Sequence, residues 1–68
     1  MTDTVEFEIS LKRAGITKKA LAEKLNISLQ SLYHKINNTT EFKASEIIKI
    51  CDFLKLSCRE RDKIFFTQ

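Results

Sequence analysis

The sequence predicts an all-α fold, a compact bundle of about five short helices. Apolar residues recur at spacings of three and four along most of the chain, which is the period of a helix that buries one face. One glycine and no proline among 68 residues disfavour turn-dense β folds and low-complexity chains. Hydrophobic residues make up 43% and charged residues 31%, which favours a folded domain over a disordered tail. A chain of this length fits one domain over residues 1–68.

The first helix is expected over about residues 5–14. Phe7, Leu11 and Ala14 follow the spacing i, i+4, i+7 and form one apolar stripe. Gly15 ends this helix, because glycine readily takes the positive φ found just after a helix C-terminus.

Two helices of about eight residues are expected next, separated by a tight turn. The first covers residues 18–25, with the Thr17 hydroxyl accepting a hydrogen bond from a first-turn N–H. Asn26 ends it, because asparagine is the usual substitute for glycine in the left-handed conformation. Ser28 then caps the second helix, which continues to about residue 36. The apolar positions of this pair are Leu21, Ala22, Leu25, Ile27, Leu29, Leu32 and Ile36.

A turn-rich loop at residues 37–40 leads to the last two helices. The fourth helix is expected over residues 44–54, with a poorly capped start because Lys43 stands where Ser or Thr is preferred. The motif Ser57-x-x-Glu60 is typical of a capping box and opens a last helix to about residue 66. Ile47, Ile50, Cys51 and Leu54 are expected to face inward, whereas Ile64, Phe65 and Phe66 would either close the core or form a dimer contact.

Several classes of protein are disfavoured by the residues present. Cys51 and Cys58 are too few for a disulfide framework, and with His34 as the one histidine no zinc site or other cofactor is expected. No paired carboxylates, nucleophile–base pair or phosphate loop is found, and the chain leaves no room for a pocket of about 300 Å³, so neither an enzyme nor a small-molecule ligand is expected. The first residues lack a signal-peptide pattern and no apolar run reaches membrane-spanning length, so we expect a cytoplasmic protein without a membrane partner.

A local excess of positive charge is the first indication of a partner. Residues 12–35 hold six basic residues against Glu23 alone, a net charge of +5. Such a segment favours a polyanion partner, although a solvated helical surface would carry the same charge. The segment also contains the two short helices joined by a tight turn, which predicts a helix-turn-helix over about residues 17–36. The helix of residues 28–36 would then suit the DNA major groove.

The segment from Gly15 to Ser28, GITKKALAEKLNIS, resembles the helix-turn-helix of phage Cro/CI-like regulators, the XRE or lambda-repressor-like family. The similarity continues to Leu32, and residues 35–42 and 46–51 are similar to a branch of small phage proteins. About residues 7–66 are covered. The resemblance implies a lambda-repressor-like fold. It also implies a sequence-specific transcription regulator that binds a double-stranded DNA operator, of the phage or prophage Cro-like repressor type.

The resemblance further implies which residues contact DNA. Base contacts are expected from Gln30 and His34, since a glutamine amide can pair with adenine N6 and N7. If His34 faces a phosphate, its protonated form should bind better, so affinity should rise as the pH falls from about 7.5 to about 6. Leu29 could lie on a thymine methyl group or pack in the core. Ser28, Ser31 and Tyr33 complete the base-contact set, and phosphate contacts are expected from Lys18, Lys19, Lys35, Asn37, Asn38 and Thr39, with Lys12, Arg13 and Lys43 at the periphery.

The sequence departs from the family pattern at three positions, and one alternative function remains open. Lys18 stands where the family has a glutamine that braces a recognition residue, and Asn26 and Asn38 stand where it has glycine. The alternative is a helical protein-interaction module, antitoxin-like or anti-repressor-like, on the same fold. A weak homodimer formed on DNA through the C-terminal helix would read two half-sites about 34 Å apart.

Overall fold

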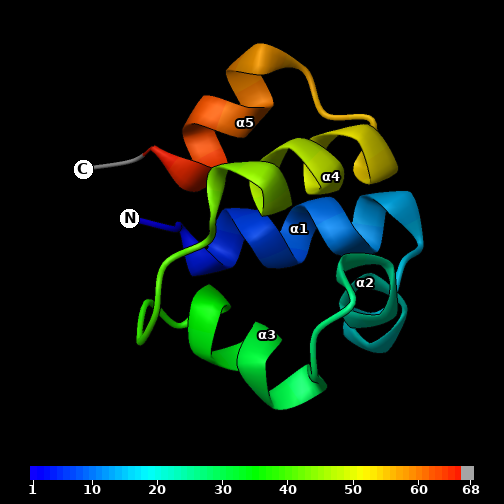
Figure 1. Cartoon of the computed structure of the whole chain (residues 1–68). Helices are drawn as coiled ribbons and strands as arrows, with labels where there is room; N and C mark the ends of the chain where they lie inside the picture. The colour runs from blue at the N-terminus through cyan, green and yellow to red at the C-terminus, as the bar shows by residue number, and fades with distance from the viewer. Residues whose placement is uncertain (67–68) are drawn as a thin grey trace.

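Five α-helices form within residues 1–66, the part of the chain that the computed structural model describes (Figure 1). The all-α expectation is confirmed, and each helix lies within one residue of its expected ends. Three-residue turns separate the helices, except that a seven-residue segment, the 37–43 loop, separates the third from the fourth. The helices are α1 (Thr4–Ala14), α2 (Lys18–Leu25), α3 (Leu29–Ile36), α4 (Ala44–Leu54) and α5 (Cys58–Phe65).

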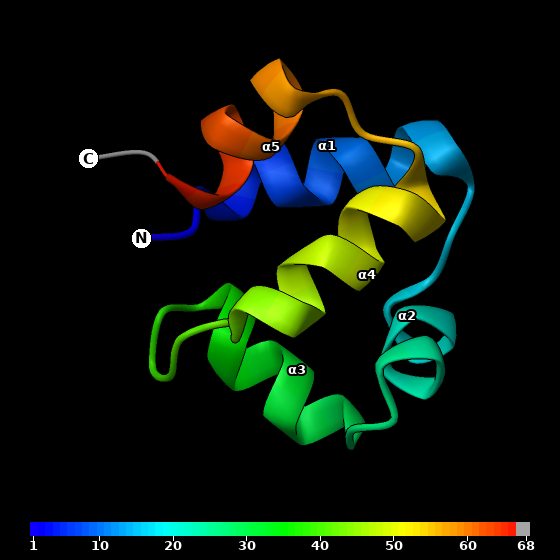
Figure 2. The same cartoon turned by 45° about the horizontal axis from the view of Figure 1, so that its top comes forward.

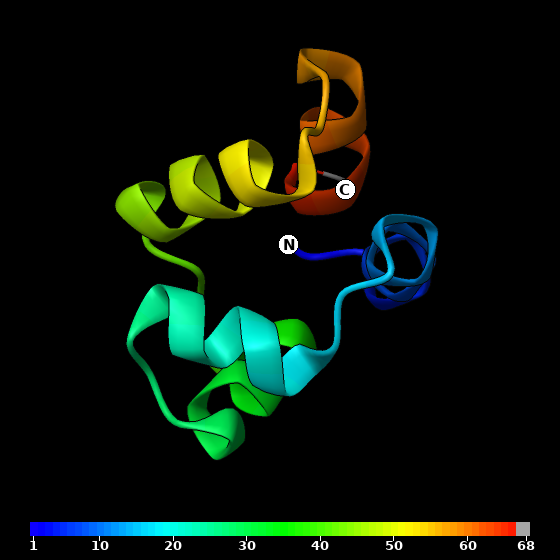
Figure 3. The same cartoon turned by 90° about the vertical axis from the view of Figure 1, so that its right-hand side faces the viewer.

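The helices fall into two groups. Figure 3 shows α2 and α3 on one side of the molecule and α4 and α5 on the other, with α1 seen end-on. α1 packs against α4 and α5, and α2 packs against α3 and α4, so the main helix–helix contact between the two groups is that of α2 with α4. The start of the chain lies beside the end of α5, because the Asp3 N–H donates a hydrogen bond of 2.7 Å to the Ile64 carbonyl.

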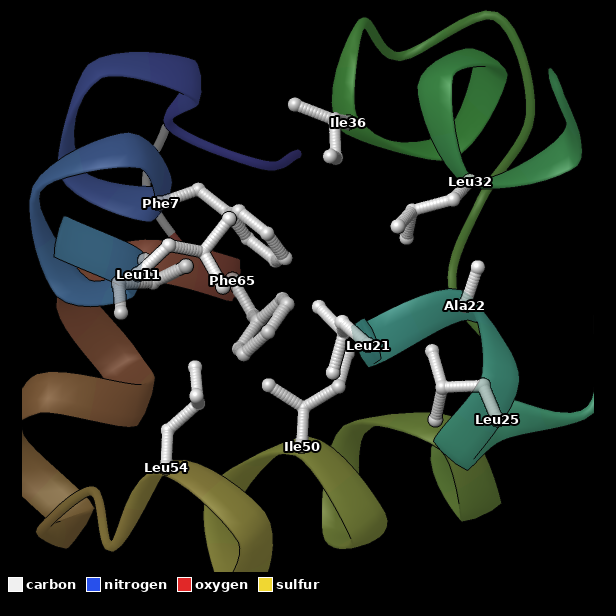
Figure 4. Packing of buried hydrophobic residues seen from close by; sticks show 11 residues of the cluster. Phe7, Leu11, Leu21, Ala22, Leu25, Leu32, Ile36, Ile50, Leu54 and Phe65 are labelled. Carbon is white, nitrogen blue, oxygen red and sulfur yellow. The ribbon is translucent and has the colours of Figure 1, made fainter. Parts of the chain in front are cut away.

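The core lies where the five helices converge. Phe7, Leu21, Leu32 and Ile50 are the largest fully buried side chains, and they come from four different helices (Figure 4). Burial of each of these side chains stabilises the fold by about 1.5–3 kcal/mol. Helices this short are held together mainly by such burial of apolar surface. The remaining buried hydrophobic residues are Leu11, Ala22, Leu25, Ile36, Leu54, Ile64 and Phe65.

An aromatic cluster extends the core toward the 37–43 loop. The Phe42 ring stacks on Phe7 at a centroid distance of 5.7 Å and meets Phe65 edge-on at 5.4 Å. Phe7 and Phe65 also meet edge-on, at 5.9 Å. Offset-stacked and edge-to-face pairs contribute about 0.5–1.5 kcal/mol each beyond their buried area. Phe42 therefore holds the end of the loop against α1 and α5, a role that the sequence did not predict.

The helix starts follow the expected capping chemistry. The hydroxyls of Thr17, Ser28 and Ser57 each accept a backbone N–H three residues ahead, at 3.0–3.1 Å. The Ser57 N–H in turn donates to Glu60 Oε1 at 3.0 Å, so the predicted capping box is confirmed. Gly15 and Asn26 both take the left-handed conformation expected at the ends of α1 and α2, with φ of 69° and 59°.

Two helix starts differ from the sequence expectation. Asp3 caps α1, its carboxylate accepting the Glu6 N–H at 3.1 Å. The Lys43 side chain makes no capping bond, as expected, yet its N–H donates to Glu46 Oε1 at 2.8 Å. Glu46 therefore satisfies a backbone donor at the start of α4 that Lys43 itself leaves open.

Two core assignments need correction. Ala14 is exposed, because it is the last residue of α1 and the stripe is no longer covered there, whereas Ser10 is buried and donates to the Phe7 carbonyl at 2.7 Å. Of the three C-terminal apolar residues, Ile64 and Phe65 are buried but Phe66 is 56% exposed. The first two therefore close the core, and only Phe66 is left for another role.

Candidate nucleic-acid interface

The turn between α2 and α3 brings the two helices together at one end (Figure 2). Asn26 is left-handed, and the next N–H, that of Ile27, donates to the Ala22 carbonyl at 3.0 Å. Ala22 is buried, so its small side chain allows the chain to fold back closely over α2. Ser28 then starts α3 in a new direction. This is a helix-turn-helix over the predicted residues.

α3 has one buried face and one exposed face. Leu32 and Ile36 are buried against the core. At 100° per residue, Gln30 and His34 lie on the opposite side, and both are exposed. Their side chains are one turn apart, so they project together from the molecule. At the start of the helix the exposed Ser28 hydroxyl donates to the hydroxyl of half-buried Ser31 at 3.0 Å.

One flank of this exposed face is apolar and aromatic. Leu29 is 36% exposed and Tyr33 is 42% exposed, and the two lie one turn apart. Leu29 therefore lies outside the buried core, although it continues the apolar stripe of the sequence. Both side chains are open to a partner that meets α3.

Lysines at the start of α2 border the same flank. The Lys18 ammonium forms an ion pair with Glu8 of α1 and lies 5.4 Å from the centre of the Tyr33 ring. Lys19, the next residue, is exposed. A cation above an aromatic ring is attracted to its π face, so Lys18 connects α1, α2 and α3 at the edge of the exposed face.

The residues near the end of α3 that are expected to bind phosphate differ in exposure and in their partners within the protein. Asn37 and Thr39 are exposed. Lys35 forms an ion pair of 3.1 Å with Glu46, and the two side chains are only 12% and 11% exposed. The Asn38 side chain makes two hydrogen bonds to the backbone of Thr2. All three residues of the peripheral set, Lys12, Arg13 and Lys43, are exposed.

Sequence reasoning missed the residues that hold these groups in place. Glu8, Glu41, Glu46 and Thr2 are partners of Lys18, Lys35 and Asn38 across the fold. Only Glu46 had a local signal, because an acid three residues after an N-cap position is typical of a capping box. The others are paired through tertiary structure alone.

A hollow of about 310 Å³ lies beside the 37–43 loop. The expectation that the chain has no room for such a volume is therefore wrong; the hollow opens between the start of the chain, the loop and the end of α5. Asn38, two residues beyond the end of α3, is the lining residue nearest to that helix along the chain. Its lining consists of Met1, Thr2, Asn38, Glu41, Phe42, Ile47, Phe65 and Phe66.

Other kinds of site find little support in the described part of the chain. Within residues 1–66, no group of three or more His, Cys, Asp or Glu residues is placed to hold a metal ion. Over the same residues, no helix combines the length and apolar character needed to cross a membrane. Burial raises the pKa of the Cys51 thiol, as expected for a small residue that packs against the core.

Comparison with protein families agrees with this geometry. A helix-turn-helix family model, HTH_3, matches residues 9–61, which include α2, α3, α4 and most of α1. Searches of curated proteins and of solved structures gave no significant match. The matched range covers more than half of the chain and contains the complete α2–turn–α3 unit. The chain therefore belongs to the HTH_3 helix-turn-helix family, the DNA-binding transcription regulators of the XRE type.

Proposed function

We propose that this protein is a phage or prophage Cro-like repressor that reads an operator through the major groove with α3. The observation that carries the proposal is the pair Gln30 and His34, exposed together on the side of α3 opposite the buried Leu32 and Ile36. An α-helix fits the major groove, where each base pair presents a distinct pattern of donors and acceptors. Side chains on the outer face of such a helix are the ones that reach base edges.

The residues on α3 offer complementary chemistry for base recognition. The Gln30 amide can pair with N6 and N7 of adenine, and the exposed part of Leu29 can lie on a thymine methyl group. His34 can donate to a base edge or a phosphate. Tyr33 lies on the flank with a hydroxyl that can reach the sugar–phosphate backbone. Ser28 and Ser31, joined by a hydrogen bond, complete the set at the start of the helix.

Phosphate contacts would hold the protein in register on the duplex. Lys18 and Lys19 lie at the start of α2, and Asn37 and Thr39 follow the end of α3, so the two groups bracket the recognition helix. Contacts of this kind fix position without reading sequence. Lys12, Arg13 and Lys43 would extend the positive surface at the periphery.

A weak homodimer would double the recognition surface. Phe66 and Met1 are 56% and 78% exposed and both line the hollow beside the 37–43 loop. Exposed apolar groups at the rim of a hollow are typical of association surfaces. A dimer that binds DNA through both α3 helices would read two half-sites about 34 Å apart.

The test is selection from random double-stranded oligonucleotides with the purified protein, followed by titration of the selected site with salt. An inverted repeat with a steep loss of affinity at high salt is expected, because each neutralised phosphate adds about 0.9 to the slope of log K against log salt. Absence of an enriched motif, with only weak salt-sensitive binding to any DNA, would contradict the proposal. That result would instead favour a protein partner on the same fold.

A further inference from the structure

The loop after the recognition helix is anchored to the start of the chain through Asn38. Asn38 Oδ1 accepts the Thr2 N–H at 2.8 Å, and Asn38 Nδ2 donates to the Thr2 carbonyl at 2.9 Å. The side-chain amide thus pairs with the backbone of a residue 36 positions away. Nearby, the Thr4 hydroxyl donates to the Ile36 carbonyl at 3.0 Å, which ties the last residue of α3 to the first residue of α1.

A second anchor lies on the other side of the loop. The Lys35 ammonium pairs with Glu46 Oε1 at 3.1 Å and donates to the Glu41 carbonyl at 3.2 Å. The same Glu46 oxygen accepts the Lys43 N–H at 2.8 Å. Both side chains of the ion pair are nearly buried. If the Lys35 ammonium left Glu46 to bind a phosphate, the Glu46 carboxylate would remain without its counter-ion in a poorly solvated site.

The backbone of the loop is also committed to α3. The N–H groups of Asn37, Asn38, Thr39 and Thr40 donate to carbonyls in the last turn and a half of that helix, and two of them converge on the His34 carbonyl. These four backbone N–H groups therefore have hydrogen-bond acceptors within the protein. The side chains of Asn37, Thr39, Thr40, Glu41 and Lys43 are exposed, and all of them except the acidic Glu41 can donate a hydrogen bond to an external phosphate.

We propose that Lys35 and Asn38 are positioning residues that hold the 37–43 loop against α3, and that neither contacts a phosphate. This inference rests on the proposed DNA-binding function and replaces the sequence-based assignment of both residues. Its consequence is a preformed loop: Asn37 and Thr39 meet the duplex without a further cost of ordering.

Two variants isolate the Asn38 anchor. Asn38→Gly removes the amide but keeps the left-handed conformation, φ 66°, that this position requires. Thr2→Pro removes the N–H that Asn38 accepts, and Thr2→Ala is the matched control that keeps it. Asn38→Gly should weaken binding to the selected site by about tenfold at most, and this loss should be smaller in the Thr2→Pro background, where only the bond to the Thr2 carbonyl remains. An equal loss in both backgrounds would show that Asn38 contacts DNA directly and would overturn its positioning role.

The Lys35 anchor is tested by the salt dependence of binding. Lys35→Met alone would leave a buried carboxylate, so it is combined with Glu46→Gln, whose amide oxygen can still accept the Lys43 N–H. The double variant should keep the wild-type salt slope, whereas the control Lys19→Met should reduce its magnitude by about 0.9. A reduction of that size in the double variant would show that Lys35 is a phosphate ligand and overturn the proposal.

Hydrogen exchange of the free protein separates failure of this inference from failure of the proposed function. The Thr39 and Thr40 amides, which donate to the His34 carbonyl, should exchange faster in Asn38→Gly and in the Lys35→Met/Glu46→Gln variant than in the wild type. Unchanged exchange in both variants would overturn the anchors whether or not the protein binds DNA. Loss of DNA binding by the wild type, with exchange as expected, would contradict the proposed function alone.

Discussion

The ammonium of Lys18 lies 5.4 Å from the centre of the Tyr33 ring, so the first residue of α2 is in contact with the exposed flank of α3. Lys18 is also paired with Glu8 of α1. Lys18 therefore contacts α3 from the position where the resemblance implies a glutamine, through charge and a π face in place of an amide pair. A phosphate that bound the Lys18 ammonium would have to compete with Glu8 for it.

Glu8→Gln is expected to increase DNA affinity. The substitution removes the internal competitor for Lys18, and partly exposed ion pairs contribute about 0.2–1 kcal/mol, which corresponds to about a 1.5- to 5-fold tighter complex. The increase should vanish when Lys18→Met is present. Glu23→Gln, which removes the same charge from α2 without touching this pair, serves as the control in fluorescence-anisotropy titrations. Equal gains with and without Lys18 would contradict the competition.

His34→Gln tests whether the imidazole faces DNA. The wild-type protein should bind its selected site more tightly as the pH falls from about 7.5 to about 6, because a protonated imidazole is attracted to phosphate. The variant should lose this dependence. Affinity titrations at matched ionic strength measure the effect, and a pH dependence that is unchanged in His34→Gln would show that another group is responsible.

Phe42→Ala is expected to destabilise the fold by about 2 kcal/mol, less than the about 3–5 kcal/mol of a fully buried phenylalanine, because Phe42 is only partly buried. The loss comes from two aromatic contacts, to Phe7 and Phe65. Phe66→Ala is the matched control on an exposed ring and should change the free energy of unfolding by less than about 0.5 kcal/mol. Urea unfolding followed by circular dichroism compares them; a larger effect at Phe66 would contradict the packing described.

Because the capping box of α5 contains a carboxylate, the stability of the fold is expected to fall at low pH. The Ser57 N–H, and then its hydroxyl, lower the pKa of the Glu60 carboxyl below its ordinary value. A carboxyl whose pKa is lowered by folding stabilises the native state above its unfolded pKa and loses that contribution as the pH falls through its folded pKa. Wild-type stability should therefore decline below about pH 4 more steeply than that of Glu60→Gln. Parallel acid-unfolding curves would show that this carboxylate contributes nothing.

The local parts of this structure could be predicted, and the long-range parts could not. The ends of α2 and α3 follow from Thr17, Asn26 and Ser28, because capping and left-handed turns depend on residues within one helical turn. The ring of Phe42 and the Asn38 amide find partners about 35 residues away, and no periodicity in the sequence marks such pairs.

The candidate site divides in the same way. Exposure of Gln30 and His34 follows from helical spacing, since Leu32 and Ile36 fix the buried face. The surroundings of Lys35 do not, because a lysine in a basic segment gives no sign that a carboxylate eleven residues ahead will cover it. Charge composition predicts a partner, whereas tertiary pairing decides which charges are available to it.

Selection of binding sites by the wild type, Gln30→Ala and Lys19→Ala in parallel tests the central claim that α3 reads base edges. Gln30→Ala should relax the preference at one base pair of each half-site, by about 1–3 kcal/mol, while Lys19→Ala should bind the same motif more weakly. If Gln30→Ala selected the wild-type motif with undiminished preference at every position, α3 would not be the element that reads the sequence.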